Sequence, residues 1–345
     1  MDLVRPIRLD DLDALLALAR AAGTGFTSLP PQREVLRQKI ERSLASFAAE
    51  VSEPGHERYM FVLEDGASGA VGGCCAVEAA CGLDEPFYNY HVGTTVHASH
   101  ALGVYKRVPT LYLSNDLTGT SVLCSLFLHP DFRRGRNGLL LSKSRFLFMA
   151  GFPQRFSVKV IAEMRGVSDE RGVSPFWEGL GRHFFHIEYG EAEHIVGQGN
   201  KACIAELMPK HPIYTVLLPP AAQTVLGQVH RETAPALRLL EQEGFRYQHY
   251  IDIFDGGPAV EAPLAEIRSV RRSRVLPVTL RPQPGPGSPH LVATTTLAGY
   301  RCLAVELETD AEHVVLSPAQ AHALQVQAGD RVRISPLAQE TGVRS

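Results

Sequence analysis

An apolar segment near the middle of the chain runs directly into a turn rich in arginine and glycine. Residues 122–128 are β-branched or large and apolar without helical spacing, which is typical of a buried strand. Pro130 ends this strand, and an Arg/Gly turn precedes an amphipathic segment that continues to Met149. This order constrains the fold to a strand, a turn and a helix, whose first amides and positive dipole end can face an anion.

The turn itself predicts a diphosphate ligand. Guanidinium groups add full positive charge and donate paired hydrogen bonds to phosphate oxygens. The residues expected to contact the ligand are Arg133, Arg134, Gly135, Arg136, Asn137 and Gly138. The alternative is a surface turn whose arginines are simply solvated.

Segments at both ends of the chain add to this pattern. Residues 3–7 predict a short strand, followed by a helix with Asp10 or Asp11 as its N-cap. Far downstream, the sequence predicts a helix that Gly244 ends, followed by a strand that finishes near Phe254.

The order of these parts resembles the GNAT superfamily of acyl-CoA N-acyltransferases. In that family the turn follows an Arg/Gln-x-x-Gly-x-Gly/Ala pattern and wraps the CoA pyrophosphate. Arg133 and Gly138 match the ends of the pattern, whereas Arg136 stands where the inner glycine is expected and Gly135 is one residue away. The resemblance implies an α+β fold with a mixed, mostly antiparallel central sheet, flanking helices and insertions.

Short motifs along the chain narrow the resemblance to arginine N-succinyltransferases. They are Thr27 to Pro30 after Phe26, FVLED at Phe61, VHAS at Val96, LSND at Leu113, SPFW at Ser174, AELMPKHPIY at Ala205, GQVH at Gly227 and YIDIFDGGP at Tyr250. The resemblance implies that succinyl-CoA and L-arginine react to N2-succinyl-L-arginine and CoA, the first step of arginine catabolism. Succinyl-CoA is then a co-substrate, and no cofactor is bound permanently. The family also implies a homo-oligomer, or a hetero-oligomer with a paralogous subunit.

The same resemblance assigns roles to individual residues. His230 ends the GQVH motif and corresponds to the family's proton donor, and an ordinary histidine pKa near 6.5 suits proton exchange. In the superfamily, backbone amides of the strand before the turn polarise the thioester carbonyl. This assigns Leu126 to succinyl-CoA contact through its main chain, with Leu128 close by.

The substrates themselves demand charged partners. A guanidinium pairs best with carboxylates, since bidentate bonds give both energy and selectivity. The candidates in family-like motifs are Asp116, Glu163, Glu206, Asp252 and Asp255, although each could instead cap a turn or pair with a structural arginine. The succinyl carboxylate needs a cation, for which the candidates are Lys201, Lys210 and the arginines of residues 268–274.

Composition excludes several other classes of protein. The net charge of −3 implies no nucleic-acid partner, and no apolar run is long enough to cross a bilayer. The six cysteines have no paired metal spacing and predict reduced thiols of a cytoplasmic protein. His183, His186 and His194 could suggest a metal site, but the aromatic residues around them favour packing, so we expect no metal.

The expected organisation is an acyltransferase domain followed by a small appendage. Residues 1–280 form the GNAT-like domain, with insertions near residues 84–112 and 166–215, the first without a clear period. A Pro/Gly linker occupies residues 281–290, and residues 291–345 form a β-rich module. Two alternatives remain open at this stage: an acyltransferase for another amine such as ornithine, or a catalytically silent acyl-CoA-binding subunit.

Overall fold

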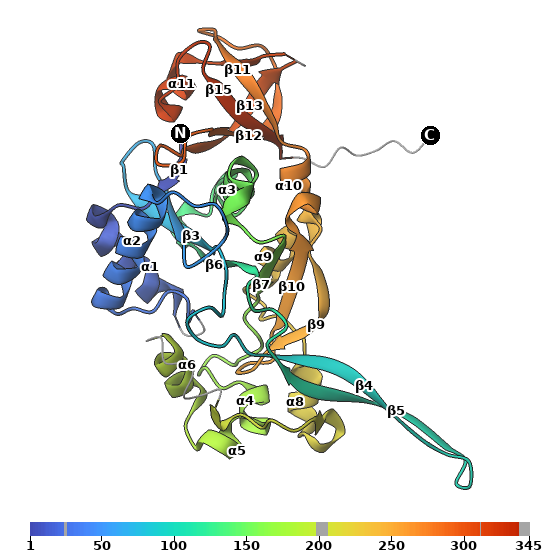
Figure 1. Ribbon diagram of the computed structural model, residues 1–345. Coiled ribbons are helices and arrows are strands. Elements are labelled where there is room, and N and C mark those ends of the chain that lie inside the picture. Colours follow the sequence, from blue (N-terminus) through green and yellow to red (C-terminus); the bar gives the residue numbers. More distant parts are fainter. Residues whose placement is uncertain (24–25, 198–205, 311, 338–345) are drawn as a thin grey trace.

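The computed structural model describes residues 1–23, 26–197, 206–310 and 312–337. Within them, fifteen strands form one mixed sheet with helices on its faces (Figure 1). The strands are β1 (Leu3–Pro6), β2 (Arg58–Glu64), β3 (Val71–Glu78), β4 (Asn89–Ser99), β5 (Val104–Ser114), β6 (Ser121–Leu128), β7 (Lys159–Glu163), β8 (Ile213–Tyr214), β9 (Arg246–Asp252), β10 (Pro258–Pro263), β11 (Arg274–Leu280), β12 (Ser288–Thr294), β13 (Cys302–Thr309), β14 (Val314–Leu316) and β15 (Arg331–Pro336). Their order in space is β12-β15-β11-β14-β13-β1-β2-β3-β6-β7-β10-β9-β4-β5-β8.

The helices connect these strands and cover them. They are α1 (Leu12–Ala22), α2 (Arg33–Ala48), α3 (Asn137–Gly151), α4 (Pro175–Gly179), α5 (Arg182–Phe185), α6 (Tyr189–Gly197), α8 (Pro220–Val225), α9 (Ala234–Glu243), α10 (Arg268–Arg271) and α11 (Pro318–Leu324). The expected mixed sheet with flanking helices is therefore confirmed. Among the described residues, no helix combines the length and apolarity needed to traverse a bilayer.

The two faces of the sheet have separate cores. Side chains alternate along β2, so that Met60 and Val62 pack with α1 and α2, whereas Tyr59 and Phe61 pack with α3. Helix α9 joins α3 on that second face through Leu240. The central strands are covered on both sides, which explains why the middle residues of β2, β3 and β6 are mostly apolar.

The divergence of β6 and β7 creates the main opening in the sheet. These two strands pair in parallel at Ser121 with Val160 and at Val122 with Ile161. Beyond these pairs, β6 continues to pair with β3 on its other side, and the register slips between Cys74 and Ala76. Ser125 lies opposite this slip with a φ of 52°, a conformation that a non-glycine residue seldom adopts. The bulge bends β6 away from β7.

At the start of the chain, Asp11 occupies the N-cap position of α1 as predicted, but it makes no capping bond with its side chain. A short 3₁₀ helix, Leu9–Asp11, precedes α1, and neither Asp10 nor Asp11 caps α1 with its side chain. The Asp11 carboxylate instead lies 2.8 Å from the buried guanidinium of Arg5 and accepts a hydrogen bond from the Arg8 amide. A buried charge needs a counter-ion, and this need outweighs the capping preference. At the other helix, Gly244 has a φ of 106° and ends α9 as predicted.

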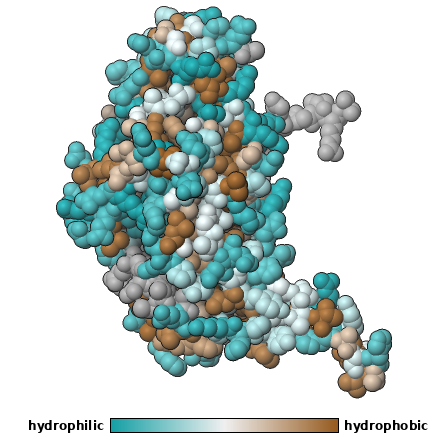
Figure 2. All heavy atoms as spheres, viewed as in Figure 1, coloured by the Kyte–Doolittle hydropathy of each residue, from teal (hydrophilic) through white to brown (hydrophobic). Residues whose placement is uncertain are grey.

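The segment expected as an insertion without clear period is a long β-hairpin. Strands β4 and β5 pair from Asn89 with Ser114 to Ser99 with Val104, and β4 joins the sheet through β9 at its base only. The hairpin projects from the body of the molecule and carries apolar residues at its far end (Figure 2). Both faces of a projecting ribbon meet solvent, so its sequence lacks the alternation that marks a half-buried strand.

Helix α3 is more buried than an amphipathic helix would be. The sequence predicts one apolar face, but the structure buries nearly every residue from Leu140 to Met149. The face away from the sheet core is covered by the C-terminal strands β12, β13 and β15 and by α9. Polar residues within α3 therefore lie in the protein interior.

The C-terminal module begins earlier than the sequence suggested. Strand β11 lies in the segment assigned to the larger domain, yet it pairs with β14 and β15. Strand β12 starts at Ser288, within the expected linker. The module is joined to the rest of the sheet where β13 pairs with β1. Cysteines 74, 75, 81, 124 and 302 are free thiols, and Cys203 lies outside the described residues.

Candidate active site

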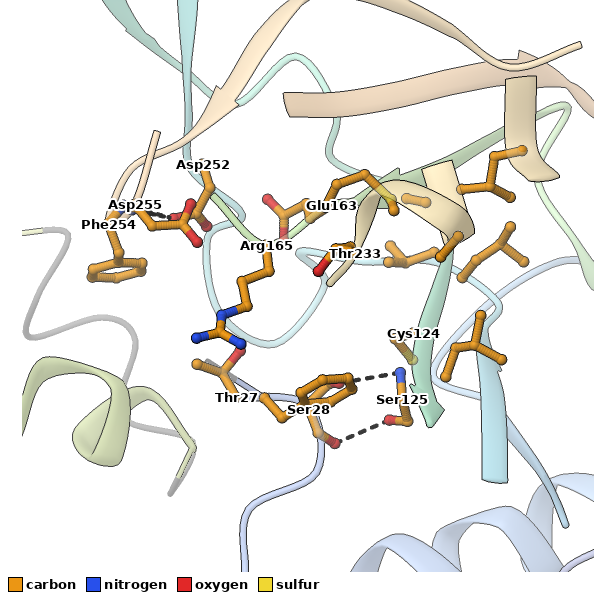
Figure 3. A pocket seen from close by; sticks show the side chains of 18 of the residues that line it. Thr27, Ser28, Cys124, Ser125, Glu163, Arg165, Thr233, Asp252, Phe254 and Asp255 are labelled. Carbon is orange, nitrogen blue, oxygen red and sulfur yellow. Dashed lines mark hydrogen bonds between the residues drawn. The ribbon is translucent and has the colours of Figure 1, made fainter. Parts of the chain in front are cut away.

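A cavity of about 190 Å³ occupies the gap between β6 and β7 (Figure 3). Leu126 and Cys124 line it from β6, and Glu163 lines it from the end of β7. The loop between α1 and α2 closes one side, and α9 closes another with Ala236, Leu240 and its N-cap residue Thr233. The cavity therefore passes through the sheet, where segments far apart in sequence meet.

The bulge in β6 is held in place by the α1–α2 loop. The Ser125 amide donates to the Ser28 hydroxyl at 3.1 Å, and the Ser125 hydroxyl donates to the Ser28 carbonyl at 3.0 Å (Figure 3). The buried Arg58 donates a further bond to the Ser125 hydroxyl at 3.0 Å. These bonds fix the main chain that leads into Leu126, so its position beside the gap is rigid.

Carboxylates gather at one end of the cavity. Figure 3 shows Glu163, Asp252 and Asp255 along the same rim. The Glu163 carboxylate accepts a hydrogen bond from Asn89 at 2.8 Å, and Asp252 accepts from the amides of Phe254 and Asp255. Asp255 is buried and accepts from the Gly166 amide at 2.6 Å. Three of the predicted guanidinium ligands, Glu163, Asp252 and Asp255, thus line the cavity.

Two arginines supply positive charge to the lining. Arg165 follows β7 and points across the opening toward the α1–α2 loop (Figure 3). Its guanidinium donates to Ser168 at 3.0 Å, and its Nε is buried without a hydrogen-bond partner in the described part of the chain. Arg145 comes from the interior of α3 and is almost completely buried.

His230 lies in a second cavity that shares Arg165 with the first. Its amide donates to the Arg165 carbonyl at 2.9 Å, and the neighbouring Val229 bridges to Gly166. The Glu232 amide donates to its Nδ1 at 3.3 Å, so the neutral ring carries its proton on Nε2. Burial, and then the nearby charges of Arg165 and Arg231, lower the pKa of His230 below its ordinary value, against the opposing effect of Glu232.

The Arg/Gly turn presents backbone amides rather than free side-chain charges. The amides of Gly135, Arg136, Gly138 and Leu139 have no acceptor among the described residues. Gly135 has a φ of 52°, which lets the chain turn sharply into α3. The turn and the N-terminus of a fifteen-residue helix therefore form a cradle of donors that suits an anion.

The arginines of the turn are paired with protein groups. Arg133 donates to the Leu128 carbonyl at 3.0 Å, Arg134 pairs with Asp65, and Arg136 lies 2.5 Å from Glu306 of the C-terminal module. The Asn137 side chain donates to Asp2 at 2.7 Å. In this structure these side chains hold the turn in position.

Several predicted site residues lie away from the cavity. Leu128 contributes its carbonyl to the turn, and Asp116 accepts a hydrogen bond from Tyr250 at 2.9 Å on the surface. Glu206 and Lys210 are exposed and do not line either opening. The arginines of residues 268–274 lie in α10, directly after it and at the start of β11, and they are also outside the lining. Lys201 lies outside the described residues.

Sequence reasoning overlooked the two arginines of the lining. Arg145 had a visible signal, because a charged residue stands within the apolar run of α3. Arg165 had none, since an arginine after a strand is ordinarily solvated. Across the described ranges, no cluster of three or more His, Cys, Asp or Glu side chains is arranged to hold a metal ion.

Comparisons with known proteins agree along the whole chain. The family model of the arginine N-succinyltransferase beta subunit matches residues 2–269, and the model of its C-terminal domain matches residues 272–336. Arginine N-succinyltransferases from Citrobacter koseri and Salmonella paratyphi B are each 51% identical over 99% of both chains.

A solved structure gives the same result for the fold. The arginine/ornithine succinyltransferase subunit AI from Pseudomonas aeruginosa is 43% identical, with a TM-score of 0.90 over 98% of this chain and 99% of that chain. The agreement includes the C-terminal strands as well as the sheet that surrounds the cavity. By sequence and by structure, this chain belongs to the arginine N-succinyltransferase family.

Proposed function

We propose that this chain transfers the succinyl group of succinyl-CoA to the α-amine of L-arginine, inside the gap between β6 and β7. The chain is an acyl-CoA-dependent N-acyltransferase by family. The observation that carries the assignment to this gap is its position: it lies between Leu126, on the strand that leads to the amide cradle, and a rim of carboxylates. An acyl-CoA and a cationic amine can therefore meet there from opposite sides.

The nucleotide end of the donor binds at the Arg/Gly turn. The unpaired amides of Gly135, Arg136, Gly138 and Leu139 match the oxygens of a diphosphate. The thioester then reaches Leu126 along the gap, as in a GNAT-type sheet. The strand-turn-helix order and the diverging parallel pair of β6 and β7 support that comparison.

The chemistry is direct attack of the amine on the thioester carbonyl. The main-chain amide of Leu126 stabilises the oxyanion that forms, because a fixed donor beside the carbonyl acts without reorganisation. His230 is the proton donor: its neutral ring gives the Nε2 proton to the departing sulfur and takes up at Nδ1 the proton that the amine loses, so that the ring stays neutral and changes only its tautomer. A lowered pKa keeps the ring neutral at pH 7, with a proton on Nε2 to give and a lone pair on Nδ1 to take one up.

The acceptor's side chain is bound by the carboxylate rim. Glu163 and Asp252 offer oxygens to the guanidinium of arginine from two strands that meet at the cavity. Ornithine carries an ammonium in place of the guanidinium and could use the same carboxylates. The name of the Pseudomonas aeruginosa relative includes both amino acids, which makes ornithine the second candidate acceptor. We also propose that the chain assembles with further subunits, as the words "beta subunit" in the family description suggest.

An assay of CoA release tests this function. The purified chain is mixed with succinyl-CoA and, separately, with arginine, ornithine, lysine and no amine, and free thiol is followed with time. We expect release with arginine, slower release with ornithine, and none without an amine. The product is identified by mass as N2-succinylarginine.

His230→Gln is the matched variant, since it keeps the size and polarity of the ring but cannot exchange protons near neutrality. We expect it to bind CoA as the wild type does and to lose at least about 100-fold in kcat. Wild-type protein that binds succinyl-CoA and releases no thiol with any amine would identify a binding subunit instead.

A further inference from the structure

Arg145 is the most deeply buried cation of the cavity lining, and it has no acidic partner in the described part of the chain. The whole residue is 2% exposed. Its Nε donates to the Ser142 carbonyl at 3.0 Å and its terminal nitrogen lies 3.3 Å from the Ser142 hydroxyl, within the same helix turn. These bonds satisfy part of a guanidinium that has five N–H donors.

The groups around Arg145 do not neutralise its charge. Its electrostatic neighbours are the thiols of Cys75 and Cys124. Burial raises the pKa of Cys75 to about 12 and also raises the pKa of Cys124, so both thiols are uncharged at pH 7. Burial in turn lowers the pKa of Arg145 itself. A buried charge of this kind is costly unless an anion accompanies it.

The cavity gives Arg145 a ligand-accessible side. Arg145 lines the cavity, and so do Leu126 and apolar residues such as Val122, Ala162 and Leu240. Arg165, the other cation of the lining, is shared with the His230 cavity, so it lies where the two openings meet. The two arginines therefore differ in position: Arg165 lies where the two openings meet, whereas Arg145 reaches the cavity from the buried interior of α3.

We propose that Arg145 binds the terminal carboxylate of the acyl group, and that this ion pair makes the enzyme select a dicarboxylic acyl-CoA over a neutral one. The inference rests on the proposed function and replaces the lysines and arginines that the sequence suggested for this role. A planar guanidinium can form two parallel hydrogen bonds to a carboxylate, which fixes the acyl chain as well as neutralising it. The apolar walls suit the methylene groups between the carboxylate and the thioester.

The test compares two donors that differ in the carboxylate. Succinyl-CoA and butyryl-CoA have acyl chains of the same length, and only the first is charged at its end. We expect Arg145→Met to lower kcat/KM for succinyl-CoA by roughly 100-fold or more, and to leave the much lower value for butyryl-CoA unchanged or raised. Arg145→Lys keeps the charge but loses the paired bonds, so its kcat/KM for succinyl-CoA should lie between the values of the wild type and Arg145→Met.

Two further measurements separate binding from folding. Free CoA lacks the acyl carboxylate, so its Kd should be the same for wild type and Arg145→Met. The midpoint of thermal unfolding without ligand should not fall in Arg145→Met, because methionine removes an unpaired buried charge. A structural arginine would instead give a lower midpoint in this variant.

Arg165→Met serves as the comparison variant within the same cavity. It should change the rate with both donors together and leave the ratio of succinyl-CoA to butyryl-CoA close to that of the wild type. An unchanged donor ratio in Arg145→Met would overturn the inference while leaving the transferase function intact. Absence of thiol release in the wild type would instead overturn the function on which the inference rests.

Discussion

At the scale of single residues, Arg165 couples the two openings of the active site. Its side chain lines both, and its carbonyl holds the backbone of His230 at 2.9 Å. Its positive charge is one of the causes that lower the pKa of His230, after burial itself. The arginine therefore keeps the histidine neutral as well as shaping the cavity.

This coupling predicts how the rate depends on pH. A histidine with a lowered pKa is neutral at pH 7 and gains a proton only below about pH 6.5. We expect kcat/KM for arginine to fall on the acidic side of that value. Arg165→Met removes a neighbouring positive charge and makes protonation easier, so the acidic limb should move to higher pH. The measurement is the pH profile of kcat/KM for both proteins. An acidic limb at the same pH in the wild type and in Arg165→Met would contradict the coupling.

At the scale of helices and strands, the local signals in the sequence predicted the elements but not the cavity. The strand, turn and helix from β6 to α3 could be predicted because each depends on neighbouring residues, as could the end of α9 at Gly244. The gap forms because β7 diverges from β6 after two pairs of residues. That divergence depends on how distant strands pair, and neighbouring residues carry no signal of it. Asp11 and Arg145 escaped prediction for a related reason, since their partners and surroundings come from distant elements.

The buried ion pair between α3 and α9 gives a prediction at this scale. Lys143 and Glu243 lie 2.8 Å apart between Nζ and Oε1, and both side chains are at most 2% exposed. Glu243 also accepts from the Ser269 amide at 2.6 Å, so it fixes the start of α10. Lys143→Met leaves a carboxylate buried without its cation, which should lower the free energy of unfolding by about 3 kcal/mol.

The double variant Lys143→Met with Glu243→Gln is the control for this prediction. Glutamine has no charge to bury and can still accept from the Ser269 amide, so most of the lost stability should return. Chemical denaturation of the wild type, both single variants and the double variant measures the coupling. Additive losses in the double variant would show that the pair is not coupled.

At the scale of the whole molecule, the C-terminal module is part of the acyltransferase core. Tyr300 is buried against Phe61 and Phe148, and its hydroxyl donates to the Ser144 carbonyl of α3 at 2.6 Å. Glu306 of the module pairs with Arg136 in the turn that we propose for the diphosphate. The sequence suggested an appendage, because a Pro/Gly linker normally separates independent units. Here the strands of the module cover one face of α3.

Removal of the module tests this integration. A chain that ends at residue 271 exposes the face of α3 that β12, β13 and β15 cover, together with the ring pocket of Tyr300. We expect it to lose cooperative thermal unfolding and to aggregate, because a large apolar surface and buried polar residues of α3 become exposed. Circular dichroism and size-exclusion chromatography measure both effects.

Tyr300→Phe is the matched control within the full chain. It removes one buried hydrogen bond and leaves the Ser144 carbonyl without its donor. It should lower the free energy of unfolding by about 1–3 kcal/mol, and the chain should remain folded. A truncated chain that unfolds as cooperatively as the wild type would show that the acyltransferase core folds without the module.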